Sequence, residues 1–348
     1  MKTKKALRLL SVCFCCAGLS FGQSIYETFP DQGKQASVLL LGYRSNDFKI
    51  FGSASIFFVP VSTNNAGPAF VCAVTALHNL KDKETGDPLD GLYLKINMRP
   101  DAKPRYVKVP LKHAPPRNYW ISPSGLDLAV IPLPPEVRDG ADVITMKEDS
   151  IVTPTNITTA NVVPGLIVQM LCMQPAYWSY PADYTDPQNT PTIRMGHLSR
   201  LGFQSVSNTT AIRHHVIDIH SSPGNSGATV VVWTPDKDGH ISNPMFLGIV
   251  HGFVEEGDSY KQYQIPLPQA STQTNTISLV SAESATTNRF VLAFKTIANP
   301  NLTDVIPVHE LLGLRDSQEF LSALAIMSQN KPRYSFSTTL PIADNGKK

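Results

Sequence analysis

The chain has 348 residues, 42% of them hydrophobic and 17% charged, and a formal net charge of +2. This composition excludes an intrinsically disordered chain, and the length suffices for one large or two small packed units. The balanced charge, without a basic run or a recognisable nucleic-acid-binding module, excludes nucleic acid as an expected partner.

Residues 1–22 have the features of a signal peptide. An apolar run over 9–17 and small residues up to Gly22 follow a basic start made of Lys2, Lys4, Lys5 and Arg8. The apolar run is shorter than the roughly 20 residues that a membrane span requires. We therefore expect an exported protein, periplasmic or secreted, with no stable membrane insertion after cleavage. Lipid attachment at Cys13, Cys15 or Cys16 is the disfavoured alternative, because no convincing lipobox precedes them.

The remaining chain reads as short strands rich in Val, Ile, Leu and Phe, separated by turns of Gly, Pro, Asn and Ser. A first set is expected at 36–43, 56–61, 69–75, 92–97, 105–111 and 126–133. A second set is expected at 166–173, 192–198, 214–220, 229–233 and 246–254, followed by a strand at 290–296. Successive strands without intervening helices predict antiparallel barrels or sandwiches.

Helical spacing of leucines is clear only at 307–328, where it predicts a C-terminal α-helix with a break near Gly313. These patterns predict a signal peptide at 1–22, an N-terminal β unit at 23–150, a C-terminal β unit at 151–306, and a helix with a polar tail at 307–348. Two stretches, 177–191 with several aromatic residues and 269–288 rich in Ser, Thr and Gln, are expected to be surface loops.

Two cysteines, Cys72 and Cys172, lie outside the signal peptide, each in an apolar run. An exported protein permits a disulfide between them, but two separate buried thiols fit the sequence equally well. No Cys or His spacing resembles a structural zinc site, so no metal is expected.

Ser226 lies between Gly224 and Gly227, and strand-like segments precede and follow this turn. Glycines allow the close backbone approach and unusual dihedral angles of a tight turn, with the serine at its tip. A serine becomes a nucleophile only with a nearby base and a group that orients the base. Two candidates lie earlier in the chain, His78 after an apolar strand and Asp127 at the start of another.

Three motifs occur in one order: Thr75-Ala76-Leu77-His78, Asp127-Leu128-Ala129-Val130 and Gly224-Asn225-Ser226-Gly227. Together they resemble the chymotrypsin-like, or trypsin-like, serine protease family, in particular its bacterial exported members, and the resemblance covers about residues 36–312. It implies two six-stranded antiparallel β-barrels followed by a C-terminal α-helix. The first barrel would carry the base and acid, and the second barrel the nucleophile.

The resemblance also implies a mechanism for hydrolysing a polypeptide substrate. His78 would accept the proton of Ser226 as it attacks a peptide carbonyl, and Asp127 would orient and stabilise the imidazole. The backbone N–H groups of Gly224 and Ser226 would form the oxyanion hole. No cofactor is required. Asn225 is neutral where digestive members of the family carry an aspartate, so activation by a newly formed N-terminus is not expected.

The substrate pocket is less well defined by the sequence. By resemblance, His220 would lie at its base, His251 in its wall and Phe253 across it. The two histidines then either receive an acidic side chain or are hydrogen-bonded within the barrel. Because position 220 is not an aspartate, the resemblance does not predict a strong preference for Arg or Lys at the cleaved residue.

A second interpretation of the whole chain remains open. The same fold could serve a catalytically inactive, protease-like binding protein, which would use the barrels and the 177–191 loop for recognition.

Overall fold

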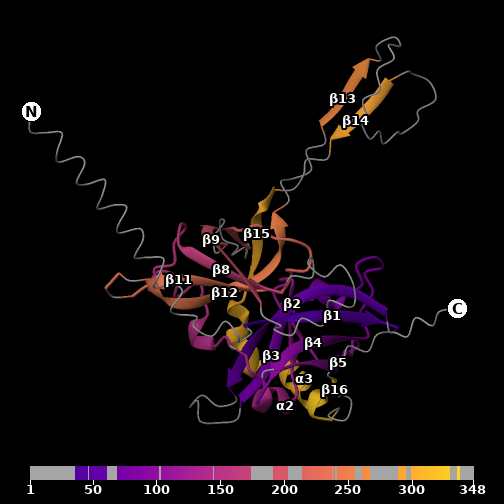
Figure 1. The fold of residues 1–348 in the computed structure, drawn as a ribbon, viewed down its shortest axis with the longest axis vertical. Coiled ribbons are helices and arrows are strands. Elements are labelled where there is room, and N and C mark those ends of the chain that lie inside the picture. The colour runs from indigo at the N-terminus through magenta and orange to yellow at the C-terminus, as the bar shows by residue number, and fades with distance from the viewer. Residues whose placement is uncertain are drawn as a thin grey trace, which may run out of the picture.

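The computed structural model describes residues 36–45, 47–60, 69–101, 103–143, 145–173, 191–202, 214–236, 238–239, 241–254, 261–266, 289–294, 299–329 and 335–337. The described chain is mostly β, with few helices, and a closed six-stranded barrel lies beside an open eight-stranded sheet (Figure 1). The mainly β class is confirmed and is consistent with a chymotrypsin-like fold. The expectation of two closed barrels is wrong for the N-terminal unit, whose sheet is open and has two edge strands.

The open sheet is antiparallel throughout, in the order β16-β5-β4-β1-β2-β3-β7-β6. Its strands are β1 (Ser37–Arg44), β2 (Asp47–Pro60), β3 (Ala69–Ala76), β4 (Gly91–Met98), β5 (Lys103–Pro110), β6 (Trp120–Ile121), β7 (Leu128–Pro132) and β16 (Ser335–Ser337). Three short helices accompany them: η1 (Leu77–Leu80), α2 (Pro135–Gly140) and η2 (Glu148–Ser150). Part of the predicted polar tail thus pairs with β5 as a strand.

β1 illustrates why these residues form a sheet that is buried on both faces. Side chains alternate across a strand, so Val38 and Leu40 enter the large core while Leu39 and Leu41 pack on the opposite face. That second face carries a smaller cluster with Tyr93 and Tyr43. A continuous apolar run is therefore expected here, because neither face of the strand is exposed to water.

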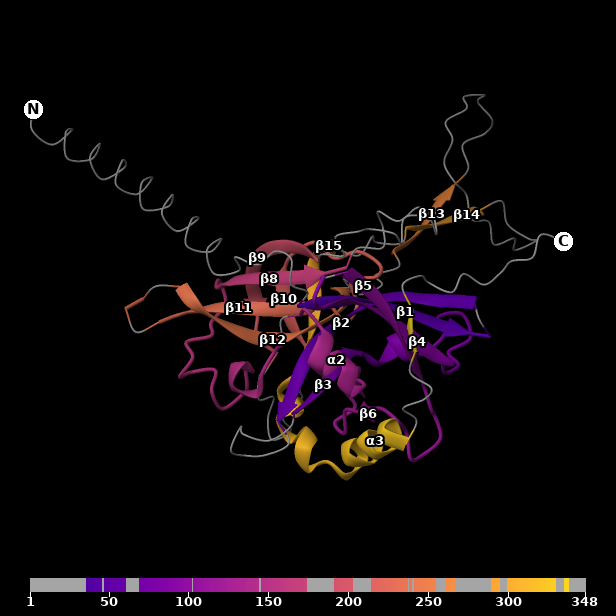
Figure 2. The same ribbon diagram turned by 60° about the horizontal axis from the view of Figure 1, so that its bottom comes forward.

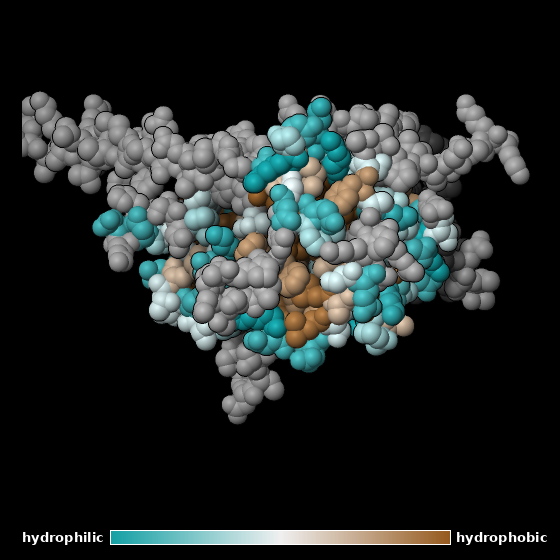
Figure 3. Space-filling view, turned by 90° about the horizontal axis from the view of Figure 1, so that it is seen from below, coloured by the Kyte–Doolittle hydropathy of each residue, from teal (hydrophilic) through white to brown (hydrophobic). Residues whose placement is uncertain are grey.

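Two helices cover the open sheet from below: η5 (His309–Asp316) and α3 (Gln318–Gln329) (Figure 2). The helical segment expected at 307–328 is divided at Ser317 and not near Gly313, which lies within η5. The Ser317 hydroxyl accepts a hydrogen bond from the Phe320 N–H at 3.3 Å and so caps α3. Leu314, Phe320 and Met327 are buried in the core of the sheet. On the underside of the molecule, apolar side chains gather near the centre of the face (Figure 3).

The closed barrel has the strand order β10-β15-β12-β11-β8-β9. Its strands are β8 (Ile167–Cys172), β9 (Thr192–Arg200), β10 (His215–Asp218), β11 (Thr229–Pro235), β12 (Ile241–Val254) and β15 (Asn299–Pro307). Sequence analysis did not predict β15. A separate hairpin joins β13 (Lys261–Pro266), also unpredicted, to β14 (Arg289–Phe294).

Cys72 and Cys172 are buried and form no disulfide with each other, so the interpretation as separate thiols is confirmed. Burial raises the pKa of the Cys72 thiol. Within the described part of the chain, no helix is long and apolar enough to cross a membrane. The expected signal peptide at 1–22, the loop at 177–191 except for its last residue, and the loop at 269–288 lie outside the described residues.

Candidate active site

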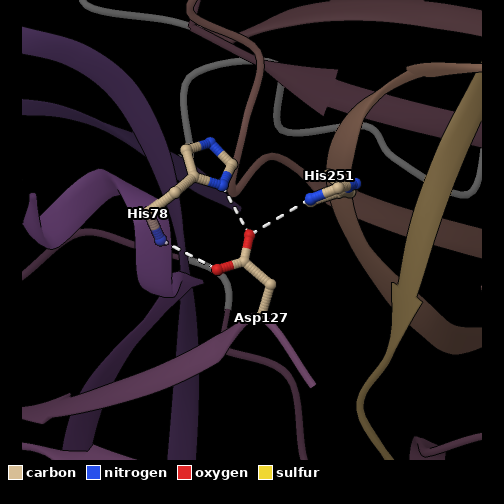
Figure 4. A group of neighbouring side chains, drawn as sticks. All are labelled: His78, Asp127 and His251. Carbon is tan, nitrogen blue, oxygen red and sulfur yellow. Dashed lines mark hydrogen bonds and ion pairs between the residues drawn. The ribbon is translucent and has the colours of Figure 1, made fainter. Parts of the chain in front are cut away.

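His78 and Asp127 are brought together by two paired strands. His78 lies in η1 directly after β3, and Asp127 precedes β7, which pairs with β3. Asp127 accepts two hydrogen bonds from the same residue (Figure 4): the His78 backbone N–H donates to Oδ1 at 2.9 Å, and Nδ1 of the ring lies 2.5 Å from Oδ2. The contact fixes the ring orientation and leaves Nε2 as the nitrogen available for proton transfer.

The turn at Ser226 depends on its glycines. Gly224 and Gly227 have φ angles of 94° and 86°, in the left-handed region that glycine adopts without strain. A Cβ at Gly227 would lie 1.9 Å from the carbonyl oxygen of Ser53, so β2 also leaves no room for a side chain. The Gly227 N–H donates to the Val250 carbonyl at 2.7 Å, which attaches the turn to β12.

The open sheet holds the same turn from the other side. The carbonyl oxygen of Ser226 accepts hydrogen bonds from the Ser53 N–H at 2.8 Å and from Nδ2 of Asn79 at 2.9 Å. Asn79 is buried and directly follows His78. The segment that carries the histidine is therefore tied to the turn that carries the serine.

The hydroxyl of Ser226 is directed elsewhere. It donates to the carbonyl oxygen of His251 at 3.0 Å, and among the described residues no hydrogen bond joins it to His78. The backbone N–H groups of Gly224 and Ser226 likewise have no acceptor within the described part of the chain. Of the expected trio, the structure brings His78 and Asp127 into contact and leaves Ser226 bound to β12.

His251 lies on β12, and its ring is held between two carboxylates. Its Nε2 is 3.3 Å from Oδ2 of Asp127, and its Nδ1 is 3.2 Å from Oδ2 of Asp304 on β15. Hydrogen bonds to Asp127 and then Asp304 raise the pKa of His251 to about 9. His251 is therefore a cation at neutral pH, in contact with the acid that orients His78.

Asp304 extends this arrangement to a further histidine. Its Oδ2 lies 2.6 Å from Nδ1 of His214, which precedes β10. Burial alone would raise the pKa of Asp304, but the hydrogen bonds from His214 and His251 lower it to about 2. The pKa of Asp127 is lowered in the same way, because hydrogen bonds from His251 and His78 outweigh its burial. We refer to His78, Asp127, His251, Asp304 and His214 as the His–Asp chain.

Sequence analysis missed Asp304 and His214. The one signal in the sequence is the His214-His215 pair, because neighbouring residues of a strand direct their side chains to opposite faces. His215 is fully buried and accepts a hydrogen bond from the Gly202 N–H at 2.9 Å, and burial lowers its pKa to about 3. His214 instead lies partly exposed against Asp304.

The other expected pocket residues lie at the surface. His220 is exposed, and Phe253 is 39% exposed. Asn225 is fully buried and its Nδ2 donates to the Ser222 hydroxyl at 3.3 Å. Among the residues that the structure describes, two sets of side chains have ligand atoms close enough to hold a metal ion: His78, Asp127 and His251, and His214, His251 and Asp304.

No protein-family model and no curated protein sequence matches this chain. Among solved structures, the MamO protease domain from Magnetospirillum magneticum matches at 14% identity, over 64% of this chain and 86% of that one, with a TM-score of 0.35. Deg5 matches at 14% identity, over 67% and 85% of the two chains, with a TM-score of 0.37.

The HtrA-type protease AlgW, solved with a tripeptide, matches at 18% identity over 65% of this chain, with a TM-score of 0.33. The match spans 53% of the AlgW chain, or about half its length. At these TM-scores the comparisons assign no family. What this site does is therefore argued from its own residues.

Proposed function

We propose that the chain is an exported serine endopeptidase, periplasmic or secreted, in which Ser226 is the nucleophile, His78 the general base and Asp127 the orienting acid. The observation that carries the proposal is the double hydrogen bond between Asp127 and His78, adjacent to Asn79, which holds the turn of Ser226. A neutral imidazole fixed through Nδ1 can accept a proton at Nε2, which is what a serine nucleophile requires.

In this mechanism, rotation about the Cα–Cβ bond of Ser226 moves its hydroxyl from the His251 carbonyl to His78. His78 accepts the hydroxyl proton while the oxygen attacks the peptide carbonyl, and Asp127 stabilises the imidazolium. The N–H groups of Gly224 and Ser226 stabilise the oxyanion. His78 then protonates the leaving amine, and water hydrolyses the acyl-enzyme in a second cycle of the same proton transfers.

His251 has a supporting role in this proposal. The charged ring of His251, whose Nε2 lies 3.3 Å from Oδ2 of Asp127, favours the ionised form of this carboxylate. An ionised Asp127 in turn stabilises the positive charge that His78 acquires during attack. His251 acts through Asp127 and has no contact with substrate in the mechanism.

A fluorophosphonate probe tests the proposal, because it forms a covalent bond only with an activated serine. We expect labelling of the wild-type protein, no labelling of Ser226→Ala, and a loss of roughly 10⁵–10⁶ in kcat for peptide hydrolysis in that variant. Ser124→Ala removes an exposed serine near Asp127 and should label normally. A folded wild-type protein that resists the probe and hydrolyses no peptide would overturn the proposal.

The second candidate, an inactive binding protein, is favoured by one observation: the Ser226 hydroxyl donates to the His251 carbonyl and not to His78. If that hydrogen bond is permanent, the serine cannot be activated. The binding protein would retain peptides unchanged, and the affinity would be equal in wild type and Ser226→Ala. Recognition by the 177–191 loop belongs to this candidate.

The specificity of the proposed peptidase for the cleaved residue can be tested at His220 and Phe253, which both lie at the surface. A peptide panel that differs only at the cleaved residue separates the two interpretations of the pocket. A preference for Glu and Asp that disappears in His220→Ala supports an acidic-side-chain pocket. Equal cleavage of all peptides would mean that the two histidines do not bind the side chain of the cleaved residue.

A further inference from the structure

The distal half of the His–Asp chain contains three potential metal ligands from three separate elements. Nδ1 of His251 lies 3.2 Å from Oδ2 of Asp304, and Nδ1 of His214 lies 2.6 Å from the same oxygen. All three ligand atoms lie within 4.8 Å of one another. His251 comes from β12, Asp304 from β15, and His214 precedes β10.

These distances are close to those of a tetrahedral site. Ligands about 2.0–2.2 Å from a zinc ion are separated from each other by roughly 3.3 Å. The pair formed by His251 and Asp304 already has this separation, and the 2.6 Å between His214 and Asp304 would lengthen by about 0.7 Å. Two imidazoles and one carboxylate also form a ligand set that zinc takes in proteins with an open fourth position.

The ligands are also accessible and oriented. The side chains of His214, His251 and Asp304 are 25%, 38% and 21% exposed, so an ion can enter from solvent. His251 would bind through Nδ1 while its Nε2–H continues to donate to Asp127, at 3.3 Å. A carboxylate behind the second nitrogen is the usual means by which proteins orient a metal-bound histidine.

We propose that His214, His251 and Asp304 form a binding site for a divalent metal ion of the zinc type, with one coordination position open. The alternative set of His78, Asp127 and His251 would direct Nδ1 of His78 and Oδ2 of Asp127 to the ion, and so replace the 2.5 Å contact on which the proposed peptidase site depends. The proposed site leaves that contact intact. The proposed peptidase mechanism makes no use of this metal ion.

Metal binding can be measured without any catalytic readout. Full-length, metal-free protein carrying Ser226→Ala is titrated with Co²⁺, whose visible absorption reports four-coordinate ligation, and Zn²⁺ then competes for the site. We expect one equivalent bound, with affinity reduced at least 10-fold by His214→Ala and by Asp304→Asn, and unchanged by His78→Ala. Saturating Zn²⁺, at roughly 100 times Kd, should raise Tm by about 5 °C in the parent protein but not in His214→Ala.

Three outcomes overturn the proposal: no stoichiometric binding, equal affinity in His214→Ala, or a loss in His78→Ala that His214→Ala does not share. His214→Gln is the second variant, since it keeps a hydrogen-bond donor toward Asp304 but offers no imidazole ligand. Circular dichroism establishes that each variant is folded. Because Ser226→Ala is inactive by design, metal binding can fail or succeed whatever the outcome for the peptidase proposal.

Discussion

The two β units of this molecule complete their cores in different ways. In the barrel of β8–β12 and β15, each strand is paired on both sides, so no edge remains. The sheet of β1–β7 and β16 ends at β6 and β16, and its core is completed by Leu314, Phe320 and Met327 from the C-terminal helices. A helical segment can thus replace the strand pairing that closes a barrel. The stability of the open sheet then depends on residues far away in sequence.

The candidate site is divided along the same line. The open sheet contributes His78 and Asp127, and the barrel contributes Ser226, His251 and Asp304. Neither unit alone contains all the residues of the proposed active site.

The largest effect is expected from Asp127→Asn, which changes the proposed orienting acid on the open-sheet side of the site. An amide cannot stabilise the imidazolium and favours the wrong tautomer, so kcat should fall by about 10⁴, as in the chymotrypsin-like case from which this magnitude is taken. Steady-state hydrolysis of a peptide measures it. Asp316→Asn, at an aspartate whose side chain is 82% exposed, is the control. A loss of less than 10-fold in Asp127→Asn would contradict the assigned role.

Phe320→Ala tests whether the helix completes the core of the open sheet. Phe320 is fully buried, and its truncation should lower the free energy of unfolding by about 3–5 kcal/mol. The adjacent Leu321 is 42% exposed, so Leu321→Ala should cost within about 0.5 kcal/mol. Urea unfolding monitors both variants. Equal costs would mean that α3 is not part of the core.

Gly227→Ala tests the turn on the barrel side. Its φ of 86° and the short distance from a Cβ to the Ser53 carbonyl should together destabilise the protein by about 3 kcal/mol. Gly239→Ala has a similar φ of 82° but open space around the Cβ, so only about 1 kcal/mol is expected. Thermal unfolding compares them. If the two costs are equal, backbone strain alone determines the effect, and the contact between the units does not.

The smallest effect concerns the pH dependence of stability. The folded-state pKa of His251 is raised to about 9 from an ordinary value of 6.5. Its stabilisation is therefore complete below pH 6.5 and is lost as pH rises through about 9. Because the side chain is 38% exposed, solvent screening limits the contribution to about 1 kcal/mol.

We expect Tm to decline more between pH 6.5 and pH 9.5 in the wild-type protein than in His251→Gln. His220→Gln, which removes an exposed histidine, should follow the wild-type decline. Parallel curves for His251→Gln and wild type would indicate that the two carboxylates do not stabilise the charged imidazole.

Local patterns predicted much of this architecture. β1, β3 and β7 lie within about two residues of their expected positions, because apolar runs bounded by turn residues are local signals. The contact between His78 and Asp127 follows from two motifs at neighbouring strand ends. β15 was missed because it contains prolines and asparagines that usually indicate a loop.

Long-range features were beyond the reach of local patterns. Asp304 contacts His251 and His214 across 53 and 90 positions of sequence, and nothing near position 304 indicates a partner. The direction of the His251 ring, toward Asp127, depends on how β12 is oriented against the open sheet. Closure of a sheet into a barrel depends on whether its end strands meet, which the strand pattern does not specify.

The hydrogen bonds from Ser53 and Asn79 to the Ser226 carbonyl have a consequence for synthesis. Strands β1–β7 of the open sheet leave the ribosome before the barrel, and they bring with them the groups that bind the later turn. A chain in which the two units have not yet docked, or an isolated barrel, would hold the turn of Ser226 without these hydrogen bonds. The proposed nucleophile is therefore assembled only when both units have docked, which would protect an unfinished chain from its own activity.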